Sequence, residues 1–203
     1  MPLNYSTDVT MSEQLTFREA MGPVSGDGNI DCSARGLTSL EGAPQEVRWD
    51  FNCSGNRLES LEGGPVGAYI NIDCSDNLLG TLIGAPPIVG AFNCSGNQLT
   101  TLQGGPMEVA ADFDCSDNML DSLDGGPAFV GGNYSCAGNE LTSLVGAPAE
   151  VGDFDCSANR LMSLAGCPDV VNGDFICGDN DELFTEEDVR EACEVRGNVI
   201  NGI

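Results

Sequence analysis

The chain has 203 residues, carries a formal charge of −25 from 32 acidic and 7 basic residues, and contains no histidine. A charge of this size and sign argues against direct binding of nucleic acid or of anionic membranes, and it favours a basic partner or simple solubility. Without histidine the chain lacks the commonest general base, pH switch and metal ligand, and no apolar run approaches membrane-spanning length.

Residues 1–26 are predicted to form an N-terminal cap with one short helix. Residues 10–21 have an amphipathic pattern, Thr10 and Glu13 have the spacing of a capping box, and Gly22 with the proline after it ends the helix. The beginning of the chain lacks the basic and hydrophobic regions of a signal peptide. We therefore expect a cytoplasmic protein, in the cell that produces it or in a host cell.

A cysteine returns every 20 or 21 residues through the middle of the chain. In the first seven of these units the eighth residue after the cysteine is leucine, the tenth is glycine and the twelfth is proline. A period this strict is typical of a solenoid, in which each unit buries its apolar edge by stacking on its neighbours. Residues 27–180 are therefore predicted to form one solenoid of eight turns. The repeated cysteines are Cys32, Cys53, Cys74, Cys94, Cys115, Cys136, Cys156 and Cys177.

Each unit combines a short strand with a polar corner. An aromatic or aliphatic residue alternates with polar neighbours and the cysteine, which is the period of two expected of a strand with one buried face. An asparagine follows where the chain leaves the strand, and we expect its buried amide to bond the backbone of its own and the adjacent turn. The glycine of the later Gly-x-Pro segment permits an unusual φ, and its proline fixes φ where no ladder hydrogen bond is needed. The asparagines are Asn56, Asn77, Asn97, Asn118, Asn139, Asn159 and Asn180.

One unit shows how these positions resemble a known pattern. Val151, Phe154 and Cys156 occupy the first three apolar slots of the leucine-rich repeat pattern L-x-x-L-x-L-x-x-N-x-L, followed by Asn159 and Leu161. The motif Cys-Ser-x-Asn-x-Leu-x-Ser-Leu-x-Gly-x-Pro is similar to the short leucine-rich repeats of bacterial and bacteriophage proteins. The resemblance implies an α/β repeat solenoid, with eight short parallel strands in one curved sheet and short helical caps at both ends. A parallel β-helix of similar period is the alternative.

Residues 181–203 are predicted to form a C-terminal helical cap. Thr185 and Asp188 have the spacing of a capping box, and the predicted helix runs through Arg196 and is closed by Gly197. Such departures from the repeat are expected at the ends of a solenoid, because the terminal units must shield the core that has no further neighbour.

The repeated cysteines are interpreted as buried, reduced thiols. Equivalent strand positions in neighbouring turns place Cβ atoms about 4.8 Å apart and parallel, whereas a disulfide needs roughly 3.8 Å and converging Cβ vectors. A zinc site is the alternative, but a column does not converge tetrahedrally. Cys167 replaces the Ala or Gly of its Gly-x-Pro segment and is interpreted as an inert substitution, because no basic residue lies nearby in the sequence. A reactive thiol is the alternative at that position.

Acidic and amide side chains occupy the strand positions that the solenoid is expected to expose on a concave sheet. Eight of these sixteen positions are Asp, five are Asn, and none is Lys or Arg. The column before the aromatic residue contains Asn29, Asp50, Asn71, Ala91, Asp112, Asn133, Asp153 and Asp174. The column before the cysteine contains Asp31, Asn52, Asp73, Asn93, Asp114, Ser135, Asp155 and Ile176. A third column, two residues after the cysteine, adds Asp76, Asp117 and Asp179.

Asp and Asn are poor strand formers, so propensity does not explain a whole sheet face built from them. We interpret the face as the docking surface of a non-enzymatic binding module for a basic partner protein, because solenoid faces are large and preformed and their charge steers encounter. A host nucleic-acid-binding or defence enzyme is a specific candidate, since a ribbon of carboxylates stands in for a phosphate backbone. The alternative is a structural or spacer protein whose acidic face serves only solubility.

Twelve residues are predicted to contact the partner. Ten are aspartates, and two are aromatic residues that precede the second and third strands. The aromatic pair is interpreted as an anchor on the flank or, alternatively, as packing at the edge of the sheet. The predicted contact residues are Asp50, Asp73, Asp76, Asp112, Asp114, Asp117, Asp153, Asp155, Asp174, Asp179, Trp49 and Tyr69.

We expect no enzymatic activity, no cofactor and no metal. The sequence has no nucleophile–base pair that includes histidine and no phosphate-cradling glycine loop, and its paired carboxylates face open solvent on a sheet. Residues 27–31 and 179–182 have the character of calcium loops, but neither continues into a full ligand pattern.

Overall fold

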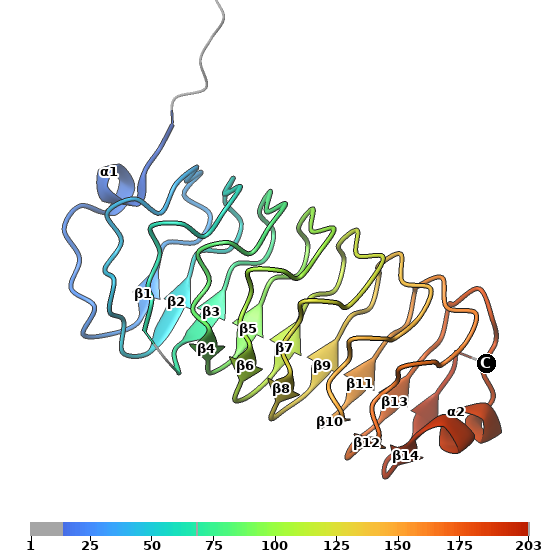
Figure 1. Ribbon diagram of the computed structural model, residues 1–203. Helices are drawn as coiled ribbons and strands as arrows, with labels where there is room; N and C mark the ends of the chain where they lie inside the picture. The colour runs from blue at the N-terminus through green and yellow to red at the C-terminus, as the bar shows by residue number, and fades with distance from the viewer. Residues whose placement is uncertain (1–13, 68, 203) are drawn as a thin grey trace, which may run out of the picture.

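The computed structural model describes residues 14–67 and 69–202, which wind into a solenoid of stacked parallel strands (Figure 1). The predicted fold class, a repeat solenoid, is confirmed. The main sheet has nine strands in chain order, because the C-terminal segment adds one strand to the eight that the repeat predicts. Its strands are β1 (Ile30–Asp31), β2 (Asp50–Asn52), β3 (Asn71–Asp73), β5 (Phe92–Asn93), β7 (Phe113–Asp114), β9 (Tyr134–Ser135), β11 (Phe154–Asp155), β13 (Phe175–Ile176) and β15 (Val199–Ile200).

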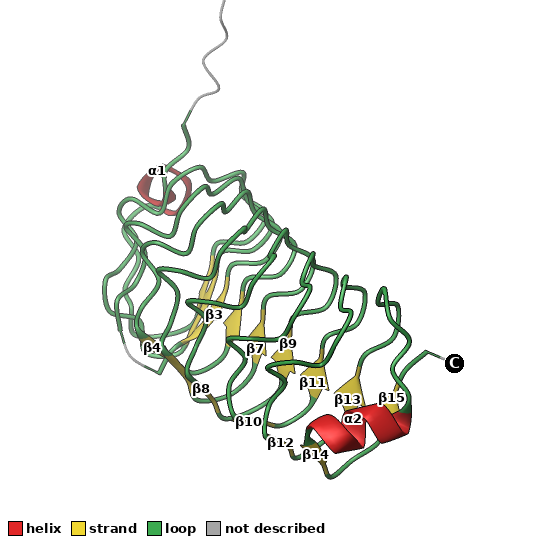
Figure 2. Ribbon diagram, turned by 45° about the vertical axis from the view of Figure 1, so that its right-hand side comes forward, coloured by secondary structure: helices red, strands yellow, loops and turns green. Residues whose placement is uncertain are grey.

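A second set of strands precedes the main strand in the later turns and forms two three-stranded parallel sheets (Figure 2). Each of these strands places one valine in the core, such as Val109 and Val151, and exposes or half-exposes its neighbour. The sequence does not predict these strands, because two residues are too few to show a period of two. They are β4 (Ile88–Val89), β6 (Glu108–Val109) and β8 (Phe129–Val130), then β10 (Glu150–Val151), β12 (Val170–Val171) and β14 (Glu194–Val195).

The core consists of side chains from equivalent repeat positions, stacked turn upon turn. The aromatic rings of the main strands lie one above another, with centroid distances of 5.1 Å between Phe113 and Tyr134 and 5.7 Å between Tyr134 and Phe154. Phe17 extends the buried aromatic layer at the N-terminal end, where its ring stacks on Phe51 at 6.3 Å. Offset ring pairs of this kind stabilise a core by about 0.5–1.5 kcal/mol each beyond the burial of their apolar area.

The predicted asparagine ladder is present and joins each turn to the one before it. The Nδ2 of Asn118 donates to the carbonyl oxygens of Cys94 and Cys115, at 3.0 and 3.1 Å, and its Oδ1 accepts the N–H of Leu99 at 3.0 Å. The two side-chain groups therefore satisfy backbone atoms of two turns in a place where no water reaches. The same pattern recurs at the other ladder asparagines.

The invariant glycine of the Gly-x-Pro segment has two physical causes. At Gly84 φ is +98°, in the left-handed region that favours glycine, and at Gly166 it is +83°. A Cβ at either position would also collide with the backbone of the preceding turn, at Leu61 and at Val145 respectively. At these two positions the Gly-x-Pro signal thus marks a close approach between successive turns.

The N-terminal helix is shorter than predicted. Helix α1 (Phe17–Met21) begins after Thr16, whose side chain accepts the N–H of Glu19 in a capping box. Residues 14–16 are not helical, so the predicted helix over 10–21 is wrong there, and the proposed capping pair Thr10 and Glu13 lies outside the described residues. The predicted stop at Gly22 is correct, with φ at +69°.

The C-terminal cap begins as predicted and ends earlier. Helix α2 (Glu186–Ala192) starts at the capping box of Thr185 and Asp188. The predicted continuation through Arg196 to Gly197 is wrong, because Cys193 is extended and the next two residues form β14, which pairs with β12. Strand pairing with the turn below therefore overrides helix propensity. No helix among the described residues is long and apolar enough to cross a membrane.

The ladder gives a first prediction. Asn118→Ala removes the partners of buried backbone groups in two turns, so we expect a loss of roughly 3 kcal/mol in the free energy of unfolding, measured by urea denaturation. Asn180→Ala is the matched control, because Asn180 makes the same bonds but is only half-buried near the end of the stack. Equal losses at the two sites would contradict a buried ladder.

Tyr134 gives a second prediction. Its ring occupies the phenylalanine column, but its fully buried hydroxyl has no hydrogen-bond partner among the described residues, and the neighbouring Cys115 thiol is only a weak acceptor. Tyr134→Phe removes this unsatisfied group, so we expect a gain of up to about 1 kcal/mol in the free energy of unfolding. A clear loss of stability in the Phe variant would show that the hydroxyl is satisfied.

Candidate functional site

The acidic and amide side chains predicted from the sequence lie in register along the exposed face of the main sheet, which we call the acidic face. Strand pairing places Asp50 beside Asn71, and Asp73 between Asn52 and Asn93. Two columns make up this face. The ladder column is Asn29, Asp50, Asn71, Ala91, Asp112, Asn133, Asp153 and Asp174, and the turn column is Asp31, Asn52, Asp73, Asn93, Asp114, Ser135, Asp155 and Ile176.

The ladder column joins successive turns through side-chain oxygens. The Oδ1 of Asp112 accepts the backbone N–H of Asn133, and the Oδ1 of Asn133 accepts that of Asp153, both at 2.8 Å. The bond recurs from Asp153 to the N–H of Asp174 at 2.8 Å and from Asp174 to that of Asn198 at 2.7 Å. Each acid or amide here supplies an acceptor to a backbone donor that would otherwise lack one. The low strand propensity of Asp and Asn gives no indication of this hydrogen-bonding role.

A sequence signal for the ladder column exists in the glycines that precede it. A Cβ at Gly152 would meet the Oδ1 of Asn133, and a Cβ at Gly173 would meet that of Asp153. The side chain of one turn therefore passes over the glycine of the next. A Gly-Asx pair repeated with the period of the solenoid predicts this contact.

The turn column has a different local cause. The Oδ1 of Asp114 accepts both the backbone N–H and the hydroxyl of Ser116, at 2.9 and 2.6 Å, which closes an Asx turn as the chain leaves the strand. Asp31 does the same with Ser33, and these bonds hold the pKa of the Asp31 carboxyl below its usual value. The equivalent turns begin at Asn52, Asp73, Asn93 and Asp155.

The sequence carries this signal too. The two turn-column positions without Asp or Asn are Ser135 and Ile176, and in those turns the following serine is replaced by Ala137 and Gly178. Asx and serine are present or absent together because each turn needs both groups. The pairing within one chain therefore reports a hydrogen bond.

The third column consists of turn residues in the left-handed region. Asp76, Asp117 and Asp179 have φ of +52°, +53° and +55°, and all three side chains are exposed. Other turns place glycine here, such as Gly96 and Gly138. Aspartate is among the residues that tolerate this backbone conformation best. A conformational reason thus accounts for these acids, and they lie at the edge of the acidic face.

The two predicted aromatic anchors lie on the flank, before β2 and β3. Trp49 is 64 % exposed and Tyr69 is 68 % exposed, so most of each residue is open to solvent. The backbone of Tyr69 has φ of +61°, unusual for a bulky residue. The two rings are not in contact, since every close ring pair of the described residues belongs to the buried aromatic layer.

A hollow of the acidic face lies at the point where the ladder is interrupted. Ala91 has no side-chain oxygen, and a groove of about 400 Å³ opens over it. Four carboxylates line this groove, from Asp50, Asp73, Asp112 and Asp114. A side chain inserted into this hollow would therefore meet four carboxylates.

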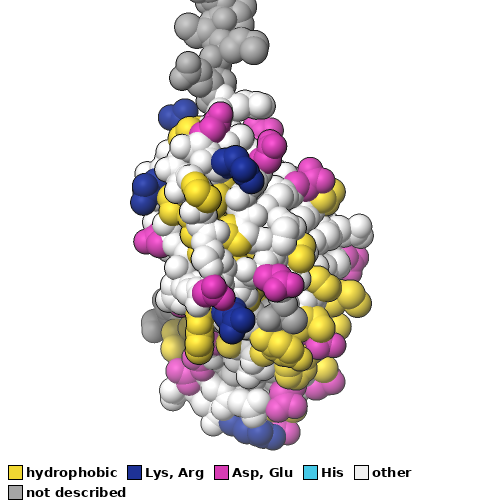
Figure 3. All heavy atoms as spheres, turned by 90° about the vertical axis from the view of Figure 1, so that its left-hand side faces the viewer, with side chains coloured by type: hydrophobic (Ala, Val, Ile, Leu, Met, Phe, Trp, Pro, Cys, Tyr) yellow, Lys and Arg dark blue, Asp and Glu magenta, His cyan; other side chains and the backbone are white. Residues whose placement is uncertain are grey.

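Within the part of the chain that the structure describes, no basic side chain neutralises the acidic face. The ion pairs of the described residues join Arg48 to Asp27, Arg160 to Glu140, Arg190 to Glu186 and Arg196 to Glu194. None of them involves the ladder or turn column. Figure 3 shows arginines at the N-terminal end of the solenoid, scattered among carboxylates and exposed apolar side chains. Within residues 14–67 and 69–202 no three Cys, Asp or Glu side chains converge as metal ligands.

The repeated cysteines are free and buried, as predicted. Several thiols donate to the backbone of the next turn, for example Cys74 to the carbonyl oxygen of Asn93 at 3.2 Å. Burial raises the pKa of the Cys32 thiol to about 12 and that of Cys177 to about 11, which makes these thiols unreactive. Cys167 differs, because it is half-buried and its thiol lies beside Cys193, a neighbour that sequence spacing does not reveal.

Comparison with known proteins adds no relative. No family model, curated protein or solved structure significantly matches the chain. A function is therefore inferred from the geometry and chemistry of the acidic face.

The structure separates the charge of an aspartate from its hydrogen bond, which gives a third prediction. Asp114→Asn keeps the Oδ1 acceptor of the Asx turn, so we expect a change within about 0.5 kcal/mol in the free energy of unfolding. Asp114→Ala removes the acceptor and leaves the donors of Ser116 unpaired, which costs about 1 kcal/mol. Ser135→Ala, at the position without such a turn, is the control and changes little. If the Asn and Ala variants of Asp114 are equally stable, the Asx turn does not contribute.

Proposed function

We propose that the protein is a non-enzymatic binding module that presents its acidic face to a basic partner protein. One observation carries the proposal: the carboxylates of the ladder and turn columns stand in fixed register, all but Asp50 are held through a single oxygen, and none is paired with a base of the described chain. Charge left unpaired over a whole sheet face favours a partner of opposite charge.

The anchored oxygen prepares each carboxylate for binding. At Asp112, Asp114, Asp153 and Asp155, Oδ1 accepts a hydrogen bond within the chain, whereas Oδ2 accepts none from the described residues. The side chains are therefore already ordered, so a partner's arginine or lysine loses less conformational entropy of this surface on binding. A bidentate or bridging contact to the second oxygen is the expected mode.

The spacing between turns determines how much electrostatic repulsion a bound partner relieves. Neighbouring turns lie about 4.8 Å apart, where two like charges repel by about 1 kcal/mol in water and by more where water is displaced. A partner that brings positive charge to several turns relieves this repulsion at once. The field of a chain with charge −25 also accelerates encounter at low ionic strength.

Within this class, a nucleic-acid-binding enzyme is the narrower proposal. A ribbon of carboxylates has the sign of charge that such an enzyme recognises in a phosphate backbone, so the protein would act as an inhibitor by occupying the nucleic-acid site. The similarity to short bacterial and bacteriophage leucine-rich repeats suggests a host defence enzyme as the target. Free thiols in all ten cysteines fit a reducing cytoplasm.

A structural or spacer role is the second candidate, and a specific observation favours it. Each of the three columns of acids has a local structural cause, in the ladder bonds of Asp112, the Asx turn of Asp114 and the left-handed turn of Asp117. Stacking alone would then select Asp and Asn, and the charge would serve solubility.

The two candidates are separated by a charge-matched pair of variants. The face variant carries Asp→Asn at 112, 114, 153 and 155, which keeps the anchoring oxygens and removes four charges. The control variant removes four charges from exposed acids outside the acidic face, with Gln or Asn at Glu41, Glu62, Asp121 and Asp124. Both variants have the same net charge, so a difference between them reports position and not total charge.

Carbodiimide coupling in a host lysate is the sharpest assay, since all seven basic residues are arginine and the chain has no lysine side chain to couple with itself. We expect wild type and control variant to couple to lysines of one basic protein through the acidic face. The face variant should bind it at least about tenfold more weakly, as should wild type when salt rises from about 50 to 300 mM. Added DNA should compete.

Two results would contradict the proposal. Equal binding by the face and control variants would mean that the acidic face is not the site. Coupling of no protein above the level of the face variant would support the spacer role.

A further inference from the structure

The C-terminal cap brings together two cysteines that do not belong to the buried column. Cys167 lies in the Gly-x-Pro segment of the last full repeat, and Cys193 is the C-cap of α2 in the next turn. In the earlier units the position of Cys167 is occupied by alanine or glycine, as at Ala147 and Gly126. The thiol is therefore not needed to form the segment.

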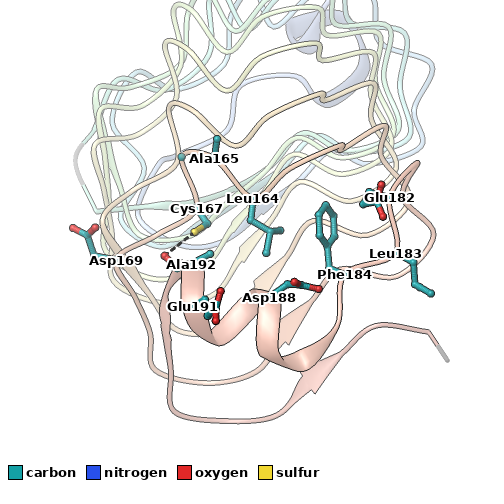
Figure 4. A pocket seen from close by; sticks show the side chains of 11 residues that line it. Leu164, Ala165, Cys167, Asp169, Glu182, Leu183, Phe184, Asp188, Glu191 and Ala192 are labelled. Carbon is teal, nitrogen blue, oxygen red and sulfur yellow. Dashed lines mark hydrogen bonds between the residues drawn. The ribbon is translucent and has the colours of Figure 1, made fainter.

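The two residues lie side by side on adjacent turns. The Sγ of Cys167 points at the end of α2, 3.5 Å from the carbonyl oxygen of Ala192, the residue before Cys193 (Figure 4). The N–H of Glu194 donates to the carbonyl oxygen of Asp169 at 3.0 Å, so the backbones on either side of the pair are bonded to each other. The thiols of Cys167 and Cys193 are close enough for each to shift the pKa of the other.

The pair differs from the column cysteines in access and in geometry. Cys167 lines an open groove of about 740 Å³ between the last full repeat and α2, whereas the column thiols are buried and parallel. The neighbouring Cys193 thiol lowers the pKa of the Cys167 thiol, and Cys167 in turn raises the pKa of Cys193. Attack on a disulfide needs an accessible thiolate, which only Cys167 of this pair offers.

We propose that Cys167 and Cys193 form a dithiol site that exchanges with small disulfides, such as glutathione disulfide, and closes into an intramolecular disulfide. Cys167 is the attacking residue and Cys193 is the resolving residue. The site is independent of the acidic face and of any partner bound there.

The chemistry balances with glutathione disulfide as the oxidant. The Cys167 thiolate attacks one sulfur, forms a mixed disulfide and releases one glutathione thiolate. Cys193 then loses its proton and attacks the Sγ of Cys167, which forms the protein disulfide and releases the second glutathione thiolate. The two protein thiols supply two electrons to the oxidant, and their two protons go to the two released glutathione thiolates.

Closing this bond would join α2 covalently to the turn below. Oxidation should therefore hold the end of the solenoid, α2 with β14 and β15, more firmly on the core, because it removes conformations in which the cap opens. Reduction would release it. The site would thus link the stability of the C-terminal cap to the thiol–disulfide balance of the compartment.

Titration of the reduced full-length protein with glutathione disulfide tests the proposal. We expect the intact mass to fall by two hydrogens, a single Cys167–Cys193 peptide link, and eight thiols that react only after denaturation. Hydrogen exchange in α2 should slow on oxidation. Cys193→Ser should stop at a stable glutathione adduct on Cys167.

Cys167→Ala, which restores the residue of the other repeats, should take up no glutathione and form no disulfide. Cys177→Ala, a column variant, should behave as wild type. The proposal fails if wild type keeps a glutathione adduct on Cys167 without resolving it. It also fails if wild type stays fully reduced while the urea-unfolded chain is oxidised, or if the disulfide found joins column cysteines.

Discussion

The fold depends on hydrogen bonds between Asx side chains and the backbone of the neighbouring turn. A solenoid of two- and three-residue strands has few ladder bonds per turn, so most polar backbone atoms at the corners need another partner. The buried asparagines supply it inside the coil, and the ladder column supplies it on the outer face. Because each bond runs from one turn to the next, a turn is satisfied only in the stack, and the repeat must keep its register.

This constraint changes how the acidic face is understood. Asp and Asn are interchangeable as acceptors through Oδ1, and the sequence uses both, yet Asp is the commoner of the two on this face. Structure explains why an acceptor is present at Asp112 or Asp114, but not why it is charged. The excess of charge over what stacking needs is the property on which the proposed binding to a basic partner depends. At Asp112 and Asp114 the second carboxylate oxygen has no partner among the described residues.

The features that recur in every repeat unit can be predicted from the sequence. The strand alternation, the Asn118 ladder, the Gly84 turn and the buried thiols follow from period and chemistry. Features that occur only once in the chain are harder to predict from the sequence. Thr10 and Thr16 both begin a Thr-x-x-Glu capping box, and the structure begins α1 at the second, whose helix places Phe17 against Phe51. The end of α2, the strands β14 and β15, and the neighbour of Cys167 depend on contacts with a previous turn, which no local pattern records. The Asx turns have a sequence pattern, an Asp or Asn followed two residues later by Ser. An interpretation based on strand propensity alone does not recognise this pattern as a hydrogen bond.

The most direct measurement is native-state hydrogen exchange at the leucine amides that donate to the asparagine ladder, among them Leu58, Leu79, Leu99 and Leu120. These amides lie outside every helix and strand, so secondary structure gives them no protection. If Asx side chains hold the turns together, they exchange only with global unfolding, at intervals that follow the repeat. Exchange as fast as that of ordinary loop amides would contradict the account.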